Sequence, residues 1–236
     1  MTTILITGAN RGLGLEYVRQ YQAEGVTIHA CCRNPDSASD LAALAAESGG
    51  KTTVHRMEVT DAAQVKAVAT SLKRVTIDRL INNAGILGTV IDQPAAGAFG
   101  SVDYAAWEEV MRVNVLGPFR VCEAFVENVA ASNEKLMVFV STHMSSITEL
   151  EDAGYYPYRS SKAALNLIVK GLSIDLADQG VRTLAFHPGW VKTDMGSDAA
   201  AIEIPDSIAG MRSVIAGFAA PRTGEFINFD NTPIQW

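Results

Sequence analysis

The segment TGANRGLG, residues 7–14, restricts the fold of this chain more than any other feature of the sequence. It places three glycines, Gly8, Gly12 and Gly14, directly after the apolar run ILI. Glycine weakens a helix or strand by roughly 0.5–1 kcal/mol relative to alanine, so this density requires a reason. Either the chain makes a tight turn there, or something must approach its backbone closely. In both cases we expect a first buried strand to lead into a first helix at these glycines.

Short apolar or β-rich runs alternate with helix-like segments along the chain. The predicted strands are 4–7, 26–32, 53–59, 79–85, 136–141, 182–188 and 225–229. The predicted helices run from the glycine segment to about 23 and over about 37–47, 61–73, 104–131, 158–178 and 205–219. This alternation is typical of βαβ units and a parallel sheet. The sequence thus predicts a single-domain α/β Rossmann fold over residues 1–236, a doubly wound parallel seven-stranded sheet with helices on both faces.

The composition is that of a folded globular protein, with 48% hydrophobic and 19% charged residues. The formal net charge of −7 disfavours overall affinity for nucleic acid or anionic membranes. No apolar run approaches the roughly 18 residues of a membrane span, and no basic targeting segment is present. Cys31 and Cys32 are neighbours and poor disulfide partners, and no Cys/His cluster has metal-site spacing. We therefore expect a cytoplasmic protein without nucleic-acid, membrane or metal partners.

A strand-to-helix turn of this kind suits the phosphates of a nucleotide. The helix begins with free N–H groups and the positive end of its dipole, which attract a pyrophosphate. On this interpretation Gly8 permits the turn, Gly12 lets the phosphates approach, and Gly14 allows the helix to pack on the strand. The spacing is GxxxGxG, however, and not the GxGxxG of the general dinucleotide fingerprint. A tight turn without any ligand therefore stays an alternative at this point.

The second predicted strand ends in the residues CCRN at 31–34, which bear on the choice of nucleotide. Sites for NAD usually carry an acidic residue there, which binds the ribose 2′-hydroxyl. Here Arg33 takes that place, and Arg11 lies within the glycine segment. Two guanidinium groups can form charge-assisted bonds to a 2′-phosphate, which favours NADP(H), with NAD(H) as the alternative. The competing interpretation is that both arginines are ordinary surface charges.

Tyr158 and Lys162 in the segment YRSSK are four positions apart and therefore share one face of a predicted helix. An isolated tyrosine has a pKa of about 10, and a neighbouring ammonium lowers that pKa by favouring the phenolate. Such a tyrosine can donate a proton to a carbonyl oxygen as hydride arrives, or remove it in the reverse direction. Alone, this spacing is common by chance and also describes ordinary surface pairs.

Six segments together resemble the short-chain dehydrogenase/reductase family in their order and approximate spacing. They are TGANRGLG, NNAG at 82–85, VNVLGP around Asn114, STHMSS, YRSSK, and HPGWVKT at 187–193. The resemblance covers essentially the whole chain. It is nearest to the small carbonyl-reductase-like branch that includes the C-signal factors, as ACCRNP and the ending FINFDNTPIQW also indicate. It implies a homodimer or homotetramer that acts with NADP(H) on a small carbonyl or alcohol substrate.

The resemblance also implies roles for individual residues. Tyr158 corresponds to the catalytic acid/base, and Lys162 to the lysine that holds the nicotinamide ribose and lowers the tyrosine pKa. Asn114 corresponds to the residue that holds a water in the proton relay, and Thr142 takes the place of the substrate-orienting serine. Besides Tyr158 and Lys162, the implied cofactor-binding positions are Gly8, Asn10, Arg11, Gly12, Leu13, Gly14, Arg33, Asn34, Glu58, Val59, Asn82, Ala84, Gly85, Pro188, Gly189, Val191 and Thr193. A short substrate loop of small and apolar residues is expected near 195–205, which suggests an uncharged or hydrophobic substrate.

Two of these positions depart from the family pattern. Thr142 keeps a hydroxyl that can hydrogen-bond a carbonyl, but its methyl group narrows the site. Ser145 and Ser146 lie close enough in sequence to take the same role. Glu58 stands where the family usually has an aspartate near the adenine, and its longer side chain shifts that contact.

Three other functions compete with the predicted one. A non-catalytic nucleotide-binding or signalling protein would keep the fold, and the altered Thr142 is the one feature in its favour. A sugar-nucleotide epimerase would share the Tyr–Lys pair, but such chains are longer and space their glycines differently. A serine hydrolase that uses His143 would need a GxSxG segment, which is missing. The predicted function is therefore an NADPH-dependent carbonyl reductase, or an alcohol dehydrogenase in the reverse direction.

Overall fold

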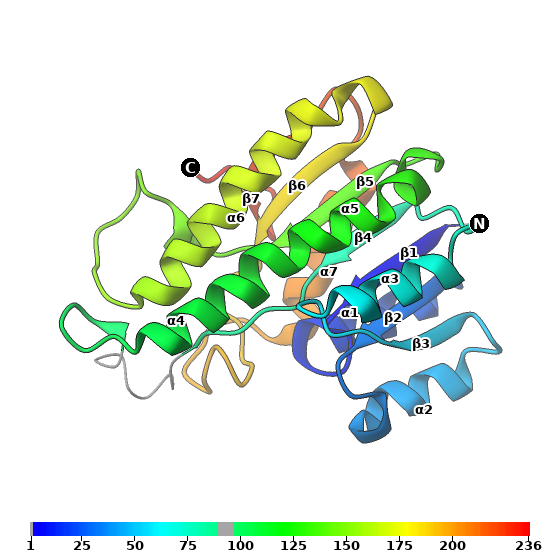
Figure 1. The fold of residues 1–236 in the computed structure, drawn as a ribbon, viewed down its shortest axis with the longest axis horizontal. Helices are drawn as coiled ribbons and strands as arrows, with labels where there is room; N and C mark the ends of the chain where they lie inside the picture. The colour runs from blue at the N-terminus through cyan, green and yellow to red at the C-terminus, as the bar shows by residue number, and fades with distance from the viewer. Residues whose placement is uncertain (1, 89–96) are drawn as a thin grey trace.

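The protein folds around one parallel sheet, which its computed structural model describes for residues 2–88 and 97–236 (Figure 1). The strands are β1 (Thr3–Thr7), β2 (Thr27–Cys32), β3 (Thr52–Arg56), β4 (Arg79–Asn82), β5 (Leu136–Val140), β6 (Arg182–His187) and β7 (Glu225–Asn228). They are ordered β3-β2-β1-β4-β5-β6-β7, and each neighbouring pair is parallel. The predicted seven-stranded, doubly wound α/β fold is confirmed. Because all strands are parallel, their carboxyl ends form one edge of the sheet.

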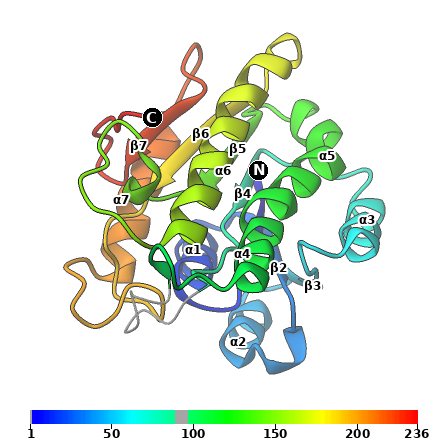
Figure 2. The same ribbon diagram turned by 60° about the vertical axis from the view of Figure 1, so that its left-hand side comes forward.

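Helices cover both faces of the sheet, as the second view makes clear (Figure 2). One face carries α1 (Gly12–Ala23), α2 (Ser39–Glu47) and α7 (Ile204–Gly217). The other face carries α3 (Ala62–Ser71), α5 (Gly117–Ala130) and α6 (Tyr156–Asp175), with α4 (Tyr104–Met111) packed against α6. The three cysteines of the chain are buried and unpaired.

Side-chain alternation along the strands explains why the core divides into two layers. In β1, Ile4 and Ile6 belong to the apolar cluster under α1 and α7, whereas Leu5 belongs to the cluster under α3, α5 and α6. All three side chains are fully buried. Burying a side chain of this size is worth roughly 1.5–3 kcal/mol, so each strand stabilises both layers at once. Within residues 2–88 and 97–236, no helix is both long enough and apolar enough to cross a membrane.

The predicted element boundaries are wrong at three places that bear on the site. The strand predicted over 53–59 ends at Arg56, and the one predicted over 79–85 ends at Asn82. The single helix predicted over 104–131 is interrupted between α4 and α5 by a π-helical segment, Arg112–Leu116. Pro118 gives the physical reason, because a proline has no N–H to continue a regular helix, and here it opens α5.

Candidate active site

The glycine segment joins β1 to α1 at the carboxyl edge of the sheet. Gly8 and Gly12 have φ angles of 66° and 54°, the left-handed region that favours glycine. A Cβ added to Gly14 would lie 2.1 Å from the Gly8 carbonyl oxygen, so the helix can start this close to the turn only with glycine. Around Gly12, by contrast, only the Thr193 methyl group comes within 4 Å of such a Cβ, at 3.9 Å. The turn is closed on the side of the strand and open at Gly12.

The amino end of α1 is suited to hold an anion. The residue before the helix is Arg11, whose side chain makes no capping hydrogen bond to the first N–H groups. Those groups and the helix dipole therefore face the open side of the turn. Leu13 packs its side chain against the core, while Asn10 is exposed. This arrangement fits the pyrophosphate of a dinucleotide.

Asn83, which no sequence pattern indicated, holds the glycine segment in place. Its Nδ2 donates to the Thr7 and Gly8 carbonyl oxygens at 3.0 and 3.1 Å. The backbone N–H groups of Asn83 and Ala84 donate to Thr7 Oγ1, both at 3.1 Å. Asn82, which was assigned, points to the other side, where its Nδ2 donates to Cys122 Sγ at 3.5 Å. The segment NNAG thus contributes Asn83, and not the Asn82 side chain, to the cofactor edge.

The two arginines expected to bind a 2′-phosphate lie at this edge with highly exposed side chains. Arg11 forms an ion pair with Asp194, which lies in the loop after β6. Arg33 Nε lies 3.7 Å from Glu58 Oε2. Exposed ion pairs of this kind are worth about 0–1 kcal/mol, so an anionic ligand can replace the carboxylates. Both guanidinium groups are available for such a ligand.

The neighbouring predicted cofactor residues shape the same edge through their backbones. Asn34 follows Arg33, and its carbonyl oxygen accepts from Ser37 Oγ at 3.2 Å. Val59 is buried, and its carbonyl oxygen accepts from Arg120 at 2.9 Å, which ties the segment after β3 to α5. Each of these two residues thus contacts a neighbouring side chain through its carbonyl oxygen.

Asn114 links the segment after β4 to α6 from within the π-helical segment. It is fully buried, with Nδ2 donating to the Ile86 carbonyl oxygen at 2.8 Å and to Ser161 Oγ at 3.0 Å. Its Oδ1 accepts from the Ile86 N–H at 2.9 Å. A Cβ on Gly85 would lie 3.2 Å from Asn114 Oδ1 and 3.4 Å from Lys162 Nζ, so Gly85 lets these groups come together. The Asn114 side chain is thus fixed by protein partners on both sides.

Tyr158 and Lys162 lie on α6 and face the carboxyl end of β5. Both are buried, with 8% and 4% of their surfaces exposed. Lys162 Nζ donates to the Val140 carbonyl oxygen at 2.8 Å, and it lies 5.9 Å from the centre of the Tyr158 ring. The Thr142 side chain acts on Tyr158 and lowers its pKa. The structure thus brings together Tyr158, Lys162 and Thr142, three of the four residues assigned to catalysis. The fourth, Asn114, lies beside Gly85 and Lys162.

The pKa of Tyr158 differs in direction from the sequence-based expectation. Burial raises it to about 12, and a smaller influence of the Thr142 side chain opposes this rise. Burial also lowers the pKa of Lys162 to about 8. Lys162 donates from its Nζ to the Val140 carbonyl oxygen. The hydroxyl of Tyr158 is therefore protonated across the neutral pH range.

The two serines that could have replaced Thr142 are engaged elsewhere. Ser145 Oγ donates to the Thr142 carbonyl oxygen at 2.5 Å and accepts from Asn166 Nδ2 at 2.8 Å. Ser146 Oγ accepts from the Glu149 N–H at 3.1 Å. Among the hydroxyl residues of this segment, Thr142 is the one that influences the pKa of Tyr158.

The loop after β6 brings the remaining predicted residues to the glycine segment. The Pro188 carbonyl oxygen accepts from Ser207 Oγ at 2.6 Å, and Val191 pairs with Ile202 through an isolated bridge. Gly189 has φ of 84°, and a Cβ there would lie 2.2 Å from Ile202 Cδ1. Together with Thr193, which approaches Gly12, these contacts close one side of the site.

The comparisons with known proteins agree with this geometry. The family model for short chain dehydrogenases matches residues 2–203. The chain belongs to the short-chain dehydrogenase family. It is 38% identical over 172 residues to C-signal of Myxococcus xanthus, an alignment covering 73% of this chain and 100% of that protein. It is 31% identical to 1-hydroxy-2-glutathionyl-2-methyl-3-butene dehydrogenase of a Rhodococcus species, over 100% of both chains. NADPH-bound carbonyl reductase from chicken fatty liver superposes with a TM-score of 0.91 at 30% identity, covering 100% of this chain and 99% of that one.

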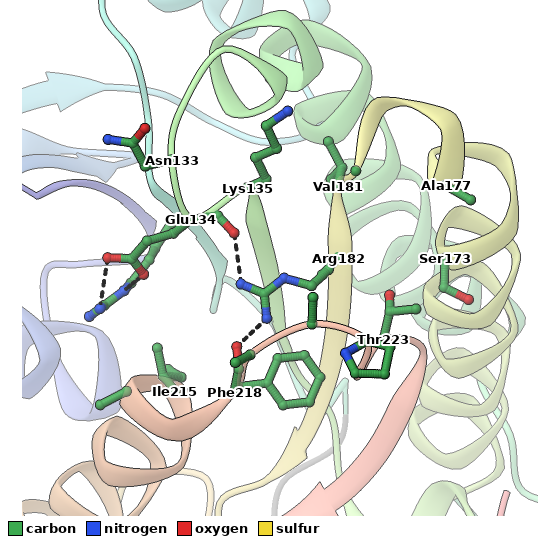
Figure 3. Close-up of a pocket in the computed structure, with 16 residues that line it drawn as sticks. Asn133, Glu134, Lys135, Ser173, Ala177, Val181, Arg182, Ile215, Phe218 and Thr223 are labelled. Carbon is green, nitrogen blue, oxygen red and sulfur yellow. Dashed lines mark hydrogen bonds and ion pairs between the residues drawn. The ribbon is translucent and has the colours of Figure 1, made fainter.

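A cavity of about 590 Å³ lies elsewhere in this short-chain dehydrogenase, at the amino ends of β4 and β6 (Figure 3). Arg182 stands at its centre and donates to the carbonyl oxygens of Phe218 and, at 2.8 Å, Glu134. Arg79 pairs with the Glu134 carboxylate at 2.6 Å. The strongest charges around this cavity are thus bound to protein partners, and it lies at the opposite end of the sheet from Tyr158.

Proposed function

We propose that this protein is an NADPH-dependent oxidoreductase that transfers hydride between nicotinamide and a small carbonyl or alcohol substrate. The observation that carries the proposal is the buried Tyr158 with Lys162 on the same helix, and with Thr142 as the side chain that acts on its pKa. The likeness to a carbonyl reductase with bound NADPH supports the choice of cofactor and of substrate class.

The chain's own residues have separate tasks in this mechanism. The dinucleotide, when bound, supplies the hydride. The glycine segment and the amino end of α1 bind its phosphates, and Lys162 binds its nicotinamide ribose. Thr142 hydrogen-bonds the substrate oxygen, and Tyr158 donates its hydroxyl proton to that oxygen. A tyrosine with a pKa of about 12 is fully protonated at neutral pH, so it is ready as the acid for reduction.

A panel of aldehydes, ketones and quinones tests this proposal, with NADPH or NADH oxidation followed by absorbance. We expect reduction of at least one uncharged carbonyl compound with NADPH. The basis for an uncharged substrate is the loop near 195–205, which is small and apolar in sequence. Trp190 stands beside it, half exposed, with Nε1 donating to the Gly196 carbonyl oxygen at 2.5 Å. A protein that binds NADPH yet reduces nothing in the panel would favour the non-catalytic alternative.

Arg33 is expected to select NADPH over NADH. Replacing it with aspartate should weaken NADPH binding by roughly 10²-fold, because a charge-assisted bond is lost and a like charge is added. NADH binding should change only a few-fold. Isothermal titration with each cofactor measures both effects, and equal losses for the two would show that Arg33 does not contact the 2′-phosphate.

We also propose a homodimer or homotetramer that pairs through α6. Leu167 and Ile174 lie seven positions apart on one face of this helix and are 75% and 67% exposed. A two-fold interface would bury the same patch on both subunits. Light scattering should give two or four times 25.2 kDa, and Leu167→Asp should reduce it to one subunit. Ile147→Asp, at an equally exposed site outside the helix, is the control and should leave the mass unchanged.

A further inference from the structure

A third arginine lies at the edge of the sheet where the cofactor would bind. Arg56 ends β3 and is the Cα partner of Cys32, which ends β2 directly before Arg33. Its NH1 donates to the Arg33 carbonyl oxygen at 3.5 Å, and its NH2 lies 2.5 Å from Asp36 Oδ2. Half of its side chain is exposed. Arg33 and Arg56 are therefore neighbours across two parallel strands.

The charges at this edge are paired in a crossed pattern. Arg33, which follows β2, pairs with Glu58, which follows β3. Arg56, at the end of β3, pairs with Asp36, which follows β2. Asp36 is 82% exposed and Arg33 is 80% exposed, so water screens both pairs and each contributes little. The guanidinium groups of these two neighbouring arginines are thus each paired with a carboxylate that a stronger anion can displace.

We infer that Arg56 binds the 2′-phosphate of NADPH together with Arg33, and that Asp36 competes with this phosphate for Arg56. A phosphate monoester carries a charge of about −1.5 to −2 at pH 7, more than a carboxylate, and three acceptor oxygens. A guanidinium has five N–H donors in a planar fork, so one phosphate can accept from two adjacent arginines. The inference rests on the proposed function, because it assigns a residue to the cofactor named there.

The sequence alone could not indicate this residue. Arg56 lies inside the run TVHRMEV, which was predicted to be a strand up to Val59. In the structure the strand ends at Arg56, and the Met57 N–H makes a last bond to β2, to the Cys32 carbonyl oxygen at 2.9 Å. The arginine therefore stands at the end of its strand and beside the turn that follows β2.

Equilibrium binding of NADPH and NADH by titration calorimetry tests the inference in the full chain. Arg56→Met keeps the aliphatic stem and removes the charge; it should weaken NADPH binding roughly tenfold or more and change NADH binding less than about twofold. Asp36→Asn should strengthen NADPH binding about two- to fivefold, because the competing carboxylate is gone, and leave NADH binding unchanged. Arg74→Met, the same charge change at an exposed site beyond α3, is the control.

The outcomes separate this inference from the proposed function. If the unmodified protein binds NADPH no better than NADH, the cofactor proposal fails, and the role of Arg56 fails with it. If the unmodified protein prefers NADPH and Arg56→Met keeps the same preference, only the role of Arg56 is overturned. An equal loss in Arg74→Met would also overturn it, because the effect would then come from overall charge. Circular dichroism of each variant verifies that it is folded.

Discussion

Tyr158→Phe is expected to lower the turnover number for carbonyl reduction by about 10²–10⁴-fold, the usual contribution of a general acid. The substitution removes one hydroxyl and almost no volume from a side chain that is 92% buried by surface area, so folding should survive. NADPH binding should also survive, because the glycine segment and the arginines are untouched. Steady-state reduction of an accepted carbonyl substrate, with calorimetric binding of NADPH alongside, measures both quantities.

Tyr156→Phe is the matched control for this experiment. Tyr156 begins the same helix and is 38% exposed, and the same atom is removed. Its turnover should stay within about twofold of the unmodified protein, as surface substitutions usually have small effects. Near-normal turnover by Tyr158→Phe would refute the assignment of Tyr158 as the general acid. It would then favour the alternative of a non-catalytic nucleotide-binding protein.

Acid is expected to destabilise the protein strongly between about pH 6.5 and pH 4 because His29 and His187 resist protonation in the folded state. Burial lowers the pKa of His29 and of His187 to about 4. The unfolded chain therefore binds more protons than the folded chain in this interval, so the free energy of unfolding falls as the pH falls. Each histidine can contribute on the order of 2–3 kcal/mol, compared with a total of about 5–15 kcal/mol for a typical protein. Urea unfolding at pH 8, 6 and 4.5 measures the decline.

The variant His29→Gln tests one part of this decline. His29 Nδ1 lies 3.0 Å from His55 Nε2, and burial lowers the pKa of His55 as well. The two rings can share one proton in a hydrogen bond, but protonating both rings places two positive charges in contact. Glutamine can keep a hydrogen bond without titrating, so the variant should lose less stability between pH 8 and pH 4.5. Parallel pH curves for the variant and the unmodified protein would contradict this explanation.

Local patterns predicted the sheet well because hydrophobic alternation and glycine turns depend on neighbours in sequence. The same patterns could not decide which asparagine of NNAG serves the site. Asn82 and Asn83 point to opposite sides, and their assignment depends on where β4 ends. That end is set by Thr7, whose hydroxyl accepts from two N–H groups after the strand. Thr7 lies on another strand, 76 positions away from Asn83.

Sequence spacing could not predict the pKa values of Tyr158 and Lys162 either. The i, i+4 spacing of Tyr158 and Lys162 correctly placed both on one helix. It could not show that the Val140 carbonyl oxygen takes the ammonium, or that burial outweighs the neighbouring charge. The partners of Arg56 and Arg11 were hidden for the same reason, because they come from segments distant in sequence.

In the π-helical segment, the number of residues is as important for the structure as their identity. The Gly117 N–H donates to the Arg112 carbonyl oxygen, five residues earlier, so the segment holds one residue more than an α-helical turn closes. Deletion of a single residue between these positions would let the helix close regularly and would rotate the preceding helix, α4, by about 100° about the helix axis. Val110, now fully buried, would leave its place, or Asn114 would turn away from Ile86. An exposed residue such as Arg112 can therefore be substituted, whereas deletion of one residue from this segment would disrupt the site.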